Sequence, residues 1–173
     1  MPFDKSNLLI TSKQVGIFKI GEKFPFTQAK ALFIDVRKEN QIRYTEDGQD
    51  NETNVIFTFG DEDLIKVQAH YDYKTNTYTD KIGEIHVVSD QFKTEKGVGV
   101  GTTIRTFISK YPDYRLWYTY VSGMYVIESK QLKAQFLLEE EDFIGKMNVS
   151  GDMTILKKSD FKEGAQIKSI RLF

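Results

Sequence analysis

Three side chains able to ligate a metal ion lie on two segments that we expect to pair as neighbouring strands. His70 belongs to the polar face of an alternating segment, residues 64–73, whose other face is apolar. Glu84 and His86 share one face of the next segment, residues 82–89. With the turn centred between the segments, His70 lies opposite Glu84 or His86. Imidazole and carboxylate suit zinc, copper or nickel. Polar faces of hairpins commonly carry such residues as solvated or cross-strand hydrogen-bonded side chains, so we predict no metal and no other cofactor.

Two runs of carboxylates, residues 61–63 and 139–142, are the other candidates for chemistry. Glycoside hydrolysis requires two carboxyl groups that face each other across a cleft, one of them with a pKa raised by burial. Consecutive carboxylates at loop ends are usually solvated and do not meet that condition. Ser122 lacks the G-x-S-x-G context of a nucleophile elbow. The chain is therefore predicted not to be an enzyme. A hydrolase that uses carboxylates, or a metal at His70 and His86, is the less favoured alternative.

A glycine run, G-V-G-V-G-T-T over residues 97–103, resembles a phosphate-binding loop only superficially. A dinucleotide fingerprint needs G-x-G-x-x-G, and a P-loop needs a Gly-Lys-Ser/Thr step. Neither is present here, although a weak anion site at the following helix stays open. We interpret the run as a strand, residues 97–100, whose glycines leave one face bare so that another element can approach closely.

An aromatic hairpin is the strongest candidate for a binding surface. Residues 114–121 and 124–129 read as strands joined by a two-residue turn, Ser122-Gly123. One face of the hairpin carries mostly tyrosines and the other carries an arginine–tryptophan pair. Both types are enriched at protein interfaces and sugar-stacking surfaces. One face must belong to the core, and burial of both faces is the alternative. The candidate binding residues are Arg115, Trp117, Tyr118, Tyr120 and Tyr125.

Two short amphipathic helices and several strands must position these residues. Apolar side chains recur at helical spacing over residues 26–33 and 104–111, and each segment follows a strand and a glycine. The remaining patterns are mostly strand-like, including residues 15–20, 132–138, 153–156 and 167–172. The fold class expected is α+β, with a twisted antiparallel sheet and two short helices. Residues 1–173 are expected to form a single domain, and its division into two similar helix-then-sheet halves, about 12-92 and 93-173, stays open.

Composition excludes several functional classes. The 173 residues carry 24 basic and 25 acidic side chains, a net charge of -1, so nucleic acid is not an expected partner. The absence of cysteine excludes disulfides and thiol chemistry. No apolar run approaches the roughly 20 residues of a membrane-spanning helix. The first residues do not form a signal peptide, so a periplasmic or extracellular location is expected only if an export signal has been trimmed.

The stretch from Gly97 to Pro112, G-V-G-V-G-T-T-I-x-x-F-x-x-x-Y-P, resembles a strand–glycine–helix element of uncharacterised bacterial cell-envelope proteins, often lipoproteins. It is also similar to the repeated unit of two-repeat modules related to the β-lactamase-inhibitor protein and outer-membrane assembly lipoproteins. Residues 16–33 resemble the same unit more weakly. The resemblance covers about 16 residues and transfers no functional residue. It implies an exported protein with a non-enzymatic binding role.

These observations predict a non-catalytic envelope or secreted domain. It would bind a macromolecular partner, either a protein or a cell-envelope polymer, through a face of its sheet. The alternative within binding is an inhibitor or immunity-type protein whose acidic loops block a partner enzyme.

Overall fold

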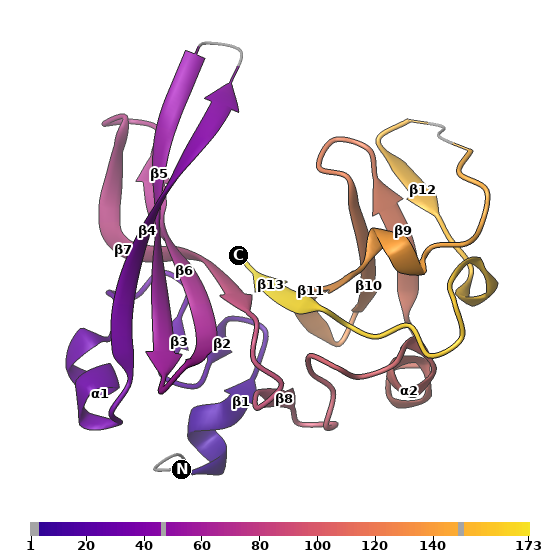
Figure 1. Cartoon of the computed structure of the whole chain (residues 1–173), viewed down its shortest axis with the longest axis horizontal. Coiled ribbons are helices and arrows are strands. Elements are labelled where there is room, and N and C mark those ends of the chain that lie inside the picture. The colour runs from indigo at the N-terminus through magenta and orange to yellow at the C-terminus, as the bar shows by residue number, and fades with distance from the viewer. Residues whose placement is uncertain (1–3, 46–47, 149–150) are drawn as a thin grey trace.

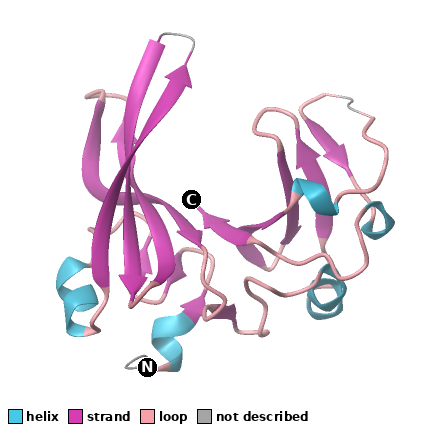
Figure 2. Ribbon diagram, in the orientation of Figure 1, coloured by secondary structure: helices cyan, strands magenta, loops and turns pink. Residues whose placement is uncertain are grey.

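The computed structural model describes residues 4–45, 48–148 and 151–173. Within them the chain forms a nine-stranded sheet, a four-stranded sheet and two short α-helices (Figures 1 and 2). All strand pairs of the large sheet are antiparallel. The predicted α+β class, with a twisted antiparallel sheet and two short helices, is confirmed.

One arm of the large sheet is a meander of four long strands. The sequence patterns located the last two of them but not the first two. The reason is that residues 35–40 and 52–54 are polar except for Val36, which is exposed, as is Ile42, so no apolar alternation marks these strands. The four strands are β4 (Asp35–Thr45), β5 (Gly48–Phe59), β6 (Glu62–Asp72) and β7 (Thr77–Val87).

The second arm is built from shorter strands, and it joins the first through the last strand of the chain. That strand pairs with β7, so the whole sheet has the order β12-β9-β10-β11-β13-β7-β6-β5-β4. Figure 1 shows the sheet bent into a U, with the C-terminus between its arms. The strands of the second arm are β9 (Arg115–Thr119), β10 (Met124–Ser129), β11 (Leu132–Leu138), β12 (Met153–Ile155) and β13 (Ser169–Leu172).

The helices and the small sheet pack on the outer face of the U, where the hydrophobic core lies. Phe107 of α2 (Ile104–Lys110) meets Phe136 edge to face, with ring centroids 4.9 Å apart. Phe18 meets Phe57 in the same way at 4.6 Å. The elements of this layer are α1 (Phe26–Ala31), β1 (Leu9–Ile10), β2 (Gln14–Val15), β3 (Phe18–Lys19) and β8 (Lys93–Thr94). The described part of the chain also contains three 3-10 turns: η1 (Lys5–Leu8), η2 (Glu140–Asp142) and η3 (Lys158–Asp160).

The structure corrects two predicted strands. Residues 15–20 do not form one strand but a tight turn between β2 and β3, which reverses at Gly16 with φ 55°. Residues 97–100 form a loop with a single bridge between Gly99 and Lys93. A Cβ atom at Gly99 would lie 2.3 Å from the backbone oxygen of Phe92, so this glycine permits a close approach of two chain segments.

Local sequence signals predicted both helices and their approximate ends. The Thr103 hydroxyl accepts a hydrogen bond from the Thr106 backbone N–H at 3.1 Å and caps α2, which ends before Pro112. The first helix is two residues shorter than predicted, because Phe33 adopts a positive φ of 58°.

The predicted aromatic hairpin also forms, but its loop holds four residues, 120–123, rather than two. Gly123 closes it with φ 66° and donates its N–H to the Thr119 carbonyl at 2.8 Å.

The chain order repeats in the two arms. Helix α1 precedes β4 to β7, and α2 precedes β9, β10, β11 and β13. Each of these sets of four strands lies in the sheet in chain order from its outer strand inwards, and β7 and β13 meet in the middle. The division of the chain into similar halves, about 12-92 and 93-173, stays a prediction.

Candidate functional site

The face of the large sheet opposite the helices, here called the inner face, carries the best candidate site. Strand register identifies it: Trp117 pairs with Val126 and with Ile155, while Leu116 and Tyr118 point to the core. In the described part of the chain, the helices and the small sheet pack on the other face (Figure 1). From β4 to β12 the inner-face residues include Arg37, Ile56, Lys66, Gln68, Glu84, His86, Arg171, Gln135, Leu137, Glu128, Val126, Arg115, Trp117 and Ile155.

A polar network occupies the middle of this face, where the two arms meet. The Arg171 guanidinium on β13 donates Nε–H to Glu84 Oε1 and an Nη1–H to Gln135 Oε1 at 3.0 Å. His86 Nε2 lies 3.2 Å from the same Glu84 oxygen. The cation of Arg171 also sits 4.6 Å from the ring centroid of Phe173. Strands β7, β11 and β13 are therefore tied together by charge-assisted hydrogen bonds as well as by backbone pairing.

The electrostatics of Glu84 reflect this setting. Burial would raise the pKa of its carboxyl. Hydrogen bonds from His86 and Arg171, and their positive charges, outweigh that effect, so the pKa is lowered from its ordinary value. Glu84 is thus held as a carboxylate, which suits a structural anchor rather than a proton donor.

A second charged pair lies further along the same face. Arg115 on β9 donates two hydrogen bonds to Glu128 on β10, its cross-strand neighbour. The guanidinium also lies 5.5 Å from the ring centroid of Trp117. The indole N–H of Trp117 is buried and has no hydrogen-bond partner among the described residues. Arg115 remains half-exposed, so an ordered cation beside an aromatic ring is presented to solvent.

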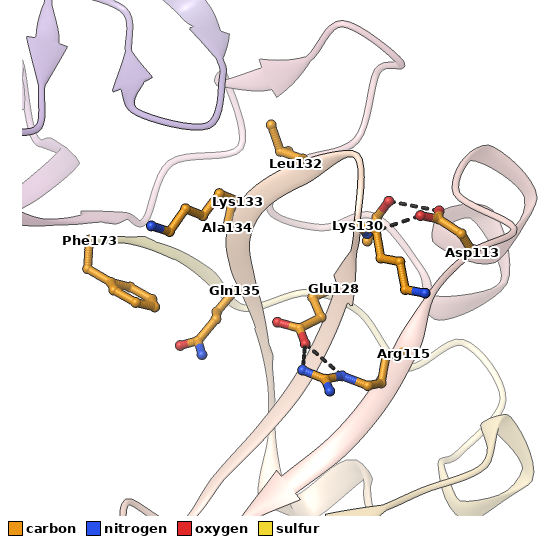
Figure 3. Close-up of a pocket in the computed structure, with 10 residues that line it drawn as sticks. Asp113, Arg115, Glu128, Lys130, Leu132, Lys133, Ala134, Gln135 and Phe173 are labelled. Atoms are coloured by element: carbon orange, nitrogen blue, oxygen red, sulfur yellow. Dashed lines mark hydrogen bonds and ion pairs between the residues drawn. The ribbon is translucent and has the colours of Figure 1, made fainter.

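A pocket of about 380 Å³ lies beside this pair (Figure 3). Its wall includes Arg115, Glu128, Gln135 and Phe173, and two lysines stand at its rim. The carboxylate of Asp113, at the opposite end, already has hydrogen-bond donors within the protein. It accepts from the Ser129 hydroxyl, from the backbone N–H of residue 130 and from the side-chain amide of residue 131. The rim lysines are Lys130 and Lys133.

The structure divides the predicted binding residues between two faces. Arg115 and Trp117 lie together on the inner face. Tyr118 and Tyr125 lie on the core face with ring centroids 4.7 Å apart, and burial raises the pKa of the Tyr125 hydroxyl. Tyr125 is only 8% exposed and packs on Phe143 and Phe161 beneath the sheet. Tyr120 is exposed in the loop after β9, beyond the last residue pair of the hairpin.

The predicted pairing of His70 with Glu84 or His86 is wrong. Glu84 pairs with Gln68, and His86 pairs with Lys66. Two irregularities in β6, between residues 68 and 71, shift the register, and His70 is exposed away from the network. Among the described residues, no three His, Cys, Asp or Glu side chains form a group that could hold a metal ion.

The carboxylate runs are scattered in the structure. Asp63 accepts from Arg37 at 3.1 Å, and Glu62 accepts from the Ser89 hydroxyl and from the Gln91 amide. In the second run, Glu139 pairs with Lys168. Glu140 and Glu141 are exposed in η2.

Sequence reasoning missed three residues of the site: Gln135, Arg171 and Phe173. In residues 169–172 buried and partly exposed side chains alternate, so Arg171 lies on the other face of the strand from Ile170 and Leu172. That alternation is a sequence signal for an inner-face residue. Its partner Glu84 is 87 positions away, and no local pattern indicates that β13 pairs with β7.

Comparisons with known proteins inform the fold alone. No protein-family model and no curated protein matches the chain. Among solved structures, it is similar to the uncharacterized protein yfeY from Escherichia coli, with a TM-score of 0.60 and 11% sequence identity. The similarity covers 95% of this chain and 98% of that one, so the overall fold is similar over nearly the full length of both chains. In the described residues, no helix has the length and apolar character needed to cross a membrane.

Proposed function

We propose that this protein is a non-catalytic binding domain that holds a macromolecular partner, a protein or a cell-envelope polymer, against the inner face. One observation carries the proposal: within the described residues, the helices and the small sheet leave uncovered a continuous sheet face built from both arms. On this face Glu84 is paired with Arg171 and His86, and Glu128 is paired with Arg115. A surface with ordered side chains loses less conformational entropy when a partner binds.

The chemistry of the inner face suits such an interface. Arg115, Trp117 and Phe173 supply the arginine and aromatic types that dominate binding energy at interfaces. Ile155 adds an exposed aliphatic side chain beside Trp117. The pairs around Glu84 and Glu128 supply polar contacts whose geometry is fixed before binding. Placement of the protein in the bacterial envelope, or outside the cell, is part of the same proposal and rests on the resemblance of residues 97–112.

An inhibitor or immunity-type protein is the second form of this proposal. Its support is the pair of exposed carboxylates in η2, Glu140 and Glu141, on a loop that could occupy a basic site of a partner enzyme. A hydrolase has weaker support. The inner-face carboxylates Glu84 and Glu128 are each bound by an arginine, and a general acid requires a raised pKa whereas that of Glu84 is lowered.

A pair of matched double variants tests the proposal. Arg115→Ala with Ile155→Glu alters the inner face, and Arg105→Ala with Ile42→Glu makes the same changes at exposed positions elsewhere. All four residues are exposed, and Arg115→Ala leaves Glu128 without its arginine. Circular dichroism therefore has to establish that both proteins are folded before binding is compared. We expect the inner-face variant to bind the partner recovered by wild-type protein from envelope extracts at least tenfold more weakly, measured as Kd with purified components. The control variant should bind like wild type. Equal affinity of both variants would exclude the inner face as the contact surface.

A further inference from the structure

A second pocket, here called the distal pocket, lies on the outer face of the first arm. It has a volume of about 430 Å³ and opens between the segment that leads into α1 and strands β4 to β7. Its volume falls within the range of about 300–1,000 Å³ that is usual for small-molecule sites. It shares no residue with the pocket beside Arg115 and Glu128 and lies on the opposite side of the sheet, so a ligand bound there is independent of the proposed function.

The body of the distal pocket is apolar and held in place. Val55 and Ala69 lie on neighbouring strands and form part of its lining; Val55 is buried and Ala69 is half-buried. Phe24 and Phe26 form an aromatic wall with ring centroids 5.7 Å apart. Phe26 also stacks on the core residue Phe57 at 5.9 Å, although nearly half of its surface is exposed.

Backbone pairing fixes the position of this wall. Gly21 donates its N–H to the Ile82 carbonyl at 2.8 Å, and Ile82 donates to the Glu22 carbonyl at 2.8 Å. A bridge between Lys23 and Lys81 continues the pairing up to the residue before Phe24. The segment therefore acts as a short extra strand along β7. Backbone pairing within the protein thus fixes the pocket wall, and little reorganisation is needed to fill the pocket.

The charges at the rim give the pocket a preference for anions. Lys23 pairs with Asp80 at 3.4 Å, which leaves that pair neutral. Lys38 is the cross-strand neighbour of Val55 and projects on the same face. Among the described residues, no carboxylate lies within ion-pair distance of the Lys38 ammonium. An unpaired ammonium next to an apolar lining is complementary to a molecule that carries one negative charge at the end of an apolar chain.

We propose that the distal pocket binds a single-chain amphiphile with a carboxylate head, of the medium-chain fatty acid type. The chain lies along Val55, Ala69 and the Phe24–Phe26 wall, and the carboxylate pairs with Lys38. An apolar side chain of a partner protein, or nonspecific adsorption of the chain, is a competing explanation that the test separates from this one.

Calorimetric titration with defined probes at pH 8, below their micelle concentrations, tests the proposal. We expect laurate to bind with one site per chain. Each shortening of the probe by two methylenes should weaken binding roughly tenfold, because each buried methylene contributes about 0.8 kcal/mol. Lys38→Glu should weaken laurate binding at least tenfold and leave dodecanol binding unchanged. Ala69→Phe should abolish binding of both probes by filling the pocket.

Lys146→Glu, a charge reversal at an exposed lysine in the second half of the chain, is the matched control and should bind laurate like wild type. Circular dichroism of each variant establishes that it is folded. If Ala69→Phe unfolds the protein, the comparison of Lys38→Glu with Lys146→Glu still tests whether Lys38 binds the carboxylate of laurate. The proposal is overturned if laurate shows no saturable one-site binding. It is also overturned if both charge reversals weaken binding equally, or if dodecyltrimethylammonium binds as tightly as laurate.

Discussion

Replacement of Phe57 by alanine is expected to lower the free energy of unfolding by about 3–5 kcal/mol. Phe57 on β5 is fully buried, and its ring contacts Phe18 of the small sheet edge to face at 4.6 Å. It also stacks on Phe26 at the start of α1. Its removal leaves a cavity where the large sheet, the small sheet and the first helix meet. Urea denaturation, followed by the fluorescence of the single tryptophan and by circular dichroism, measures the loss.

Phe33→Ala is the matched control for this substitution. Phe33 is 74% exposed, and its positive φ is equally unfavourable for phenylalanine and alanine. Its replacement should change the free energy of unfolding by no more than about 0.5 kcal/mol. Similar losses in the two variants would contradict the placement of Phe57 at the centre of the first arm's core.

The substitution Arg171→Met is expected to cost about 2–3 kcal/mol, somewhat below the 3–5 kcal/mol for breaking a fully buried ion pair. Both Arg171 and Glu84 are about three-quarters buried, so loss of the arginine leaves a buried carboxylate without its guanidinium partner, and His86 is the other side chain that contacts it. Arg37→Met is the control. Arg37 pairs with Glu39 and Asp63 at the surface, and such pairs contribute about 0–1 kcal/mol.

The effect of Arg171→Met should depend on pH in a defined direction. The pKa of Glu84 is lowered in the folded protein, so its stabilising contribution is complete above the ordinary glutamate pKa of about 4.3. It is lost as the pH falls through the lowered folded value. The difference in unfolding free energy between wild type and the variant should therefore be largest near pH 7 and shrink towards pH 3. A difference that grows on acidification would contradict the assignment. Adding Glu84→Gln to the variant should recover part of the stability at pH 7, because no unpaired carboxylate then remains.

Parts of this structure that depend on neighbouring residues were predictable from sequence. The cap at Thr103, the apolar stripe through Ile104 and Phe107, and Pro112 define α2 almost to the residue. Strict alternation located β6, and the glycine loop did prove to serve close packing at Gly99. These signals act over a few residues, where steric and hydrogen-bonding rules apply directly.

The candidate site depended on contacts that no local pattern contains. The register between β6 and β7 is shifted by bulges, so simple counting placed His70 opposite the wrong residues. Period-two alternation assigned Arg115 and Trp117 to one face and Tyr118 to the other, but it could not say which face the helices cover. The pairing of β13 with β7 creates the network of Glu84, His86 and Arg171, and it joins segments more than 80 residues apart.

The division of the sheet into a covered and an uncovered face unifies these observations. On the outer face, apolar side chains from both arms meet the helices and the small sheet in a continuous core. On the inner face, charged side chains pair along and across neighbouring strands, and only a few apolar side chains such as Ile155 are exposed. The central claim is that the inner face is where a macromolecular partner binds.

Site-specific photo-crosslinking in living cells of the native host tests this claim most directly. A benzophenone amino acid is placed at Ile155 on the inner face, or at Ile42 on the other face of β4, two exposed isoleucines of similar accessibility. We predict a discrete crosslinked product of one partner from position 155 after irradiation, and none from position 42. Equal products from both positions, or a product from position 42 alone, would contradict the account.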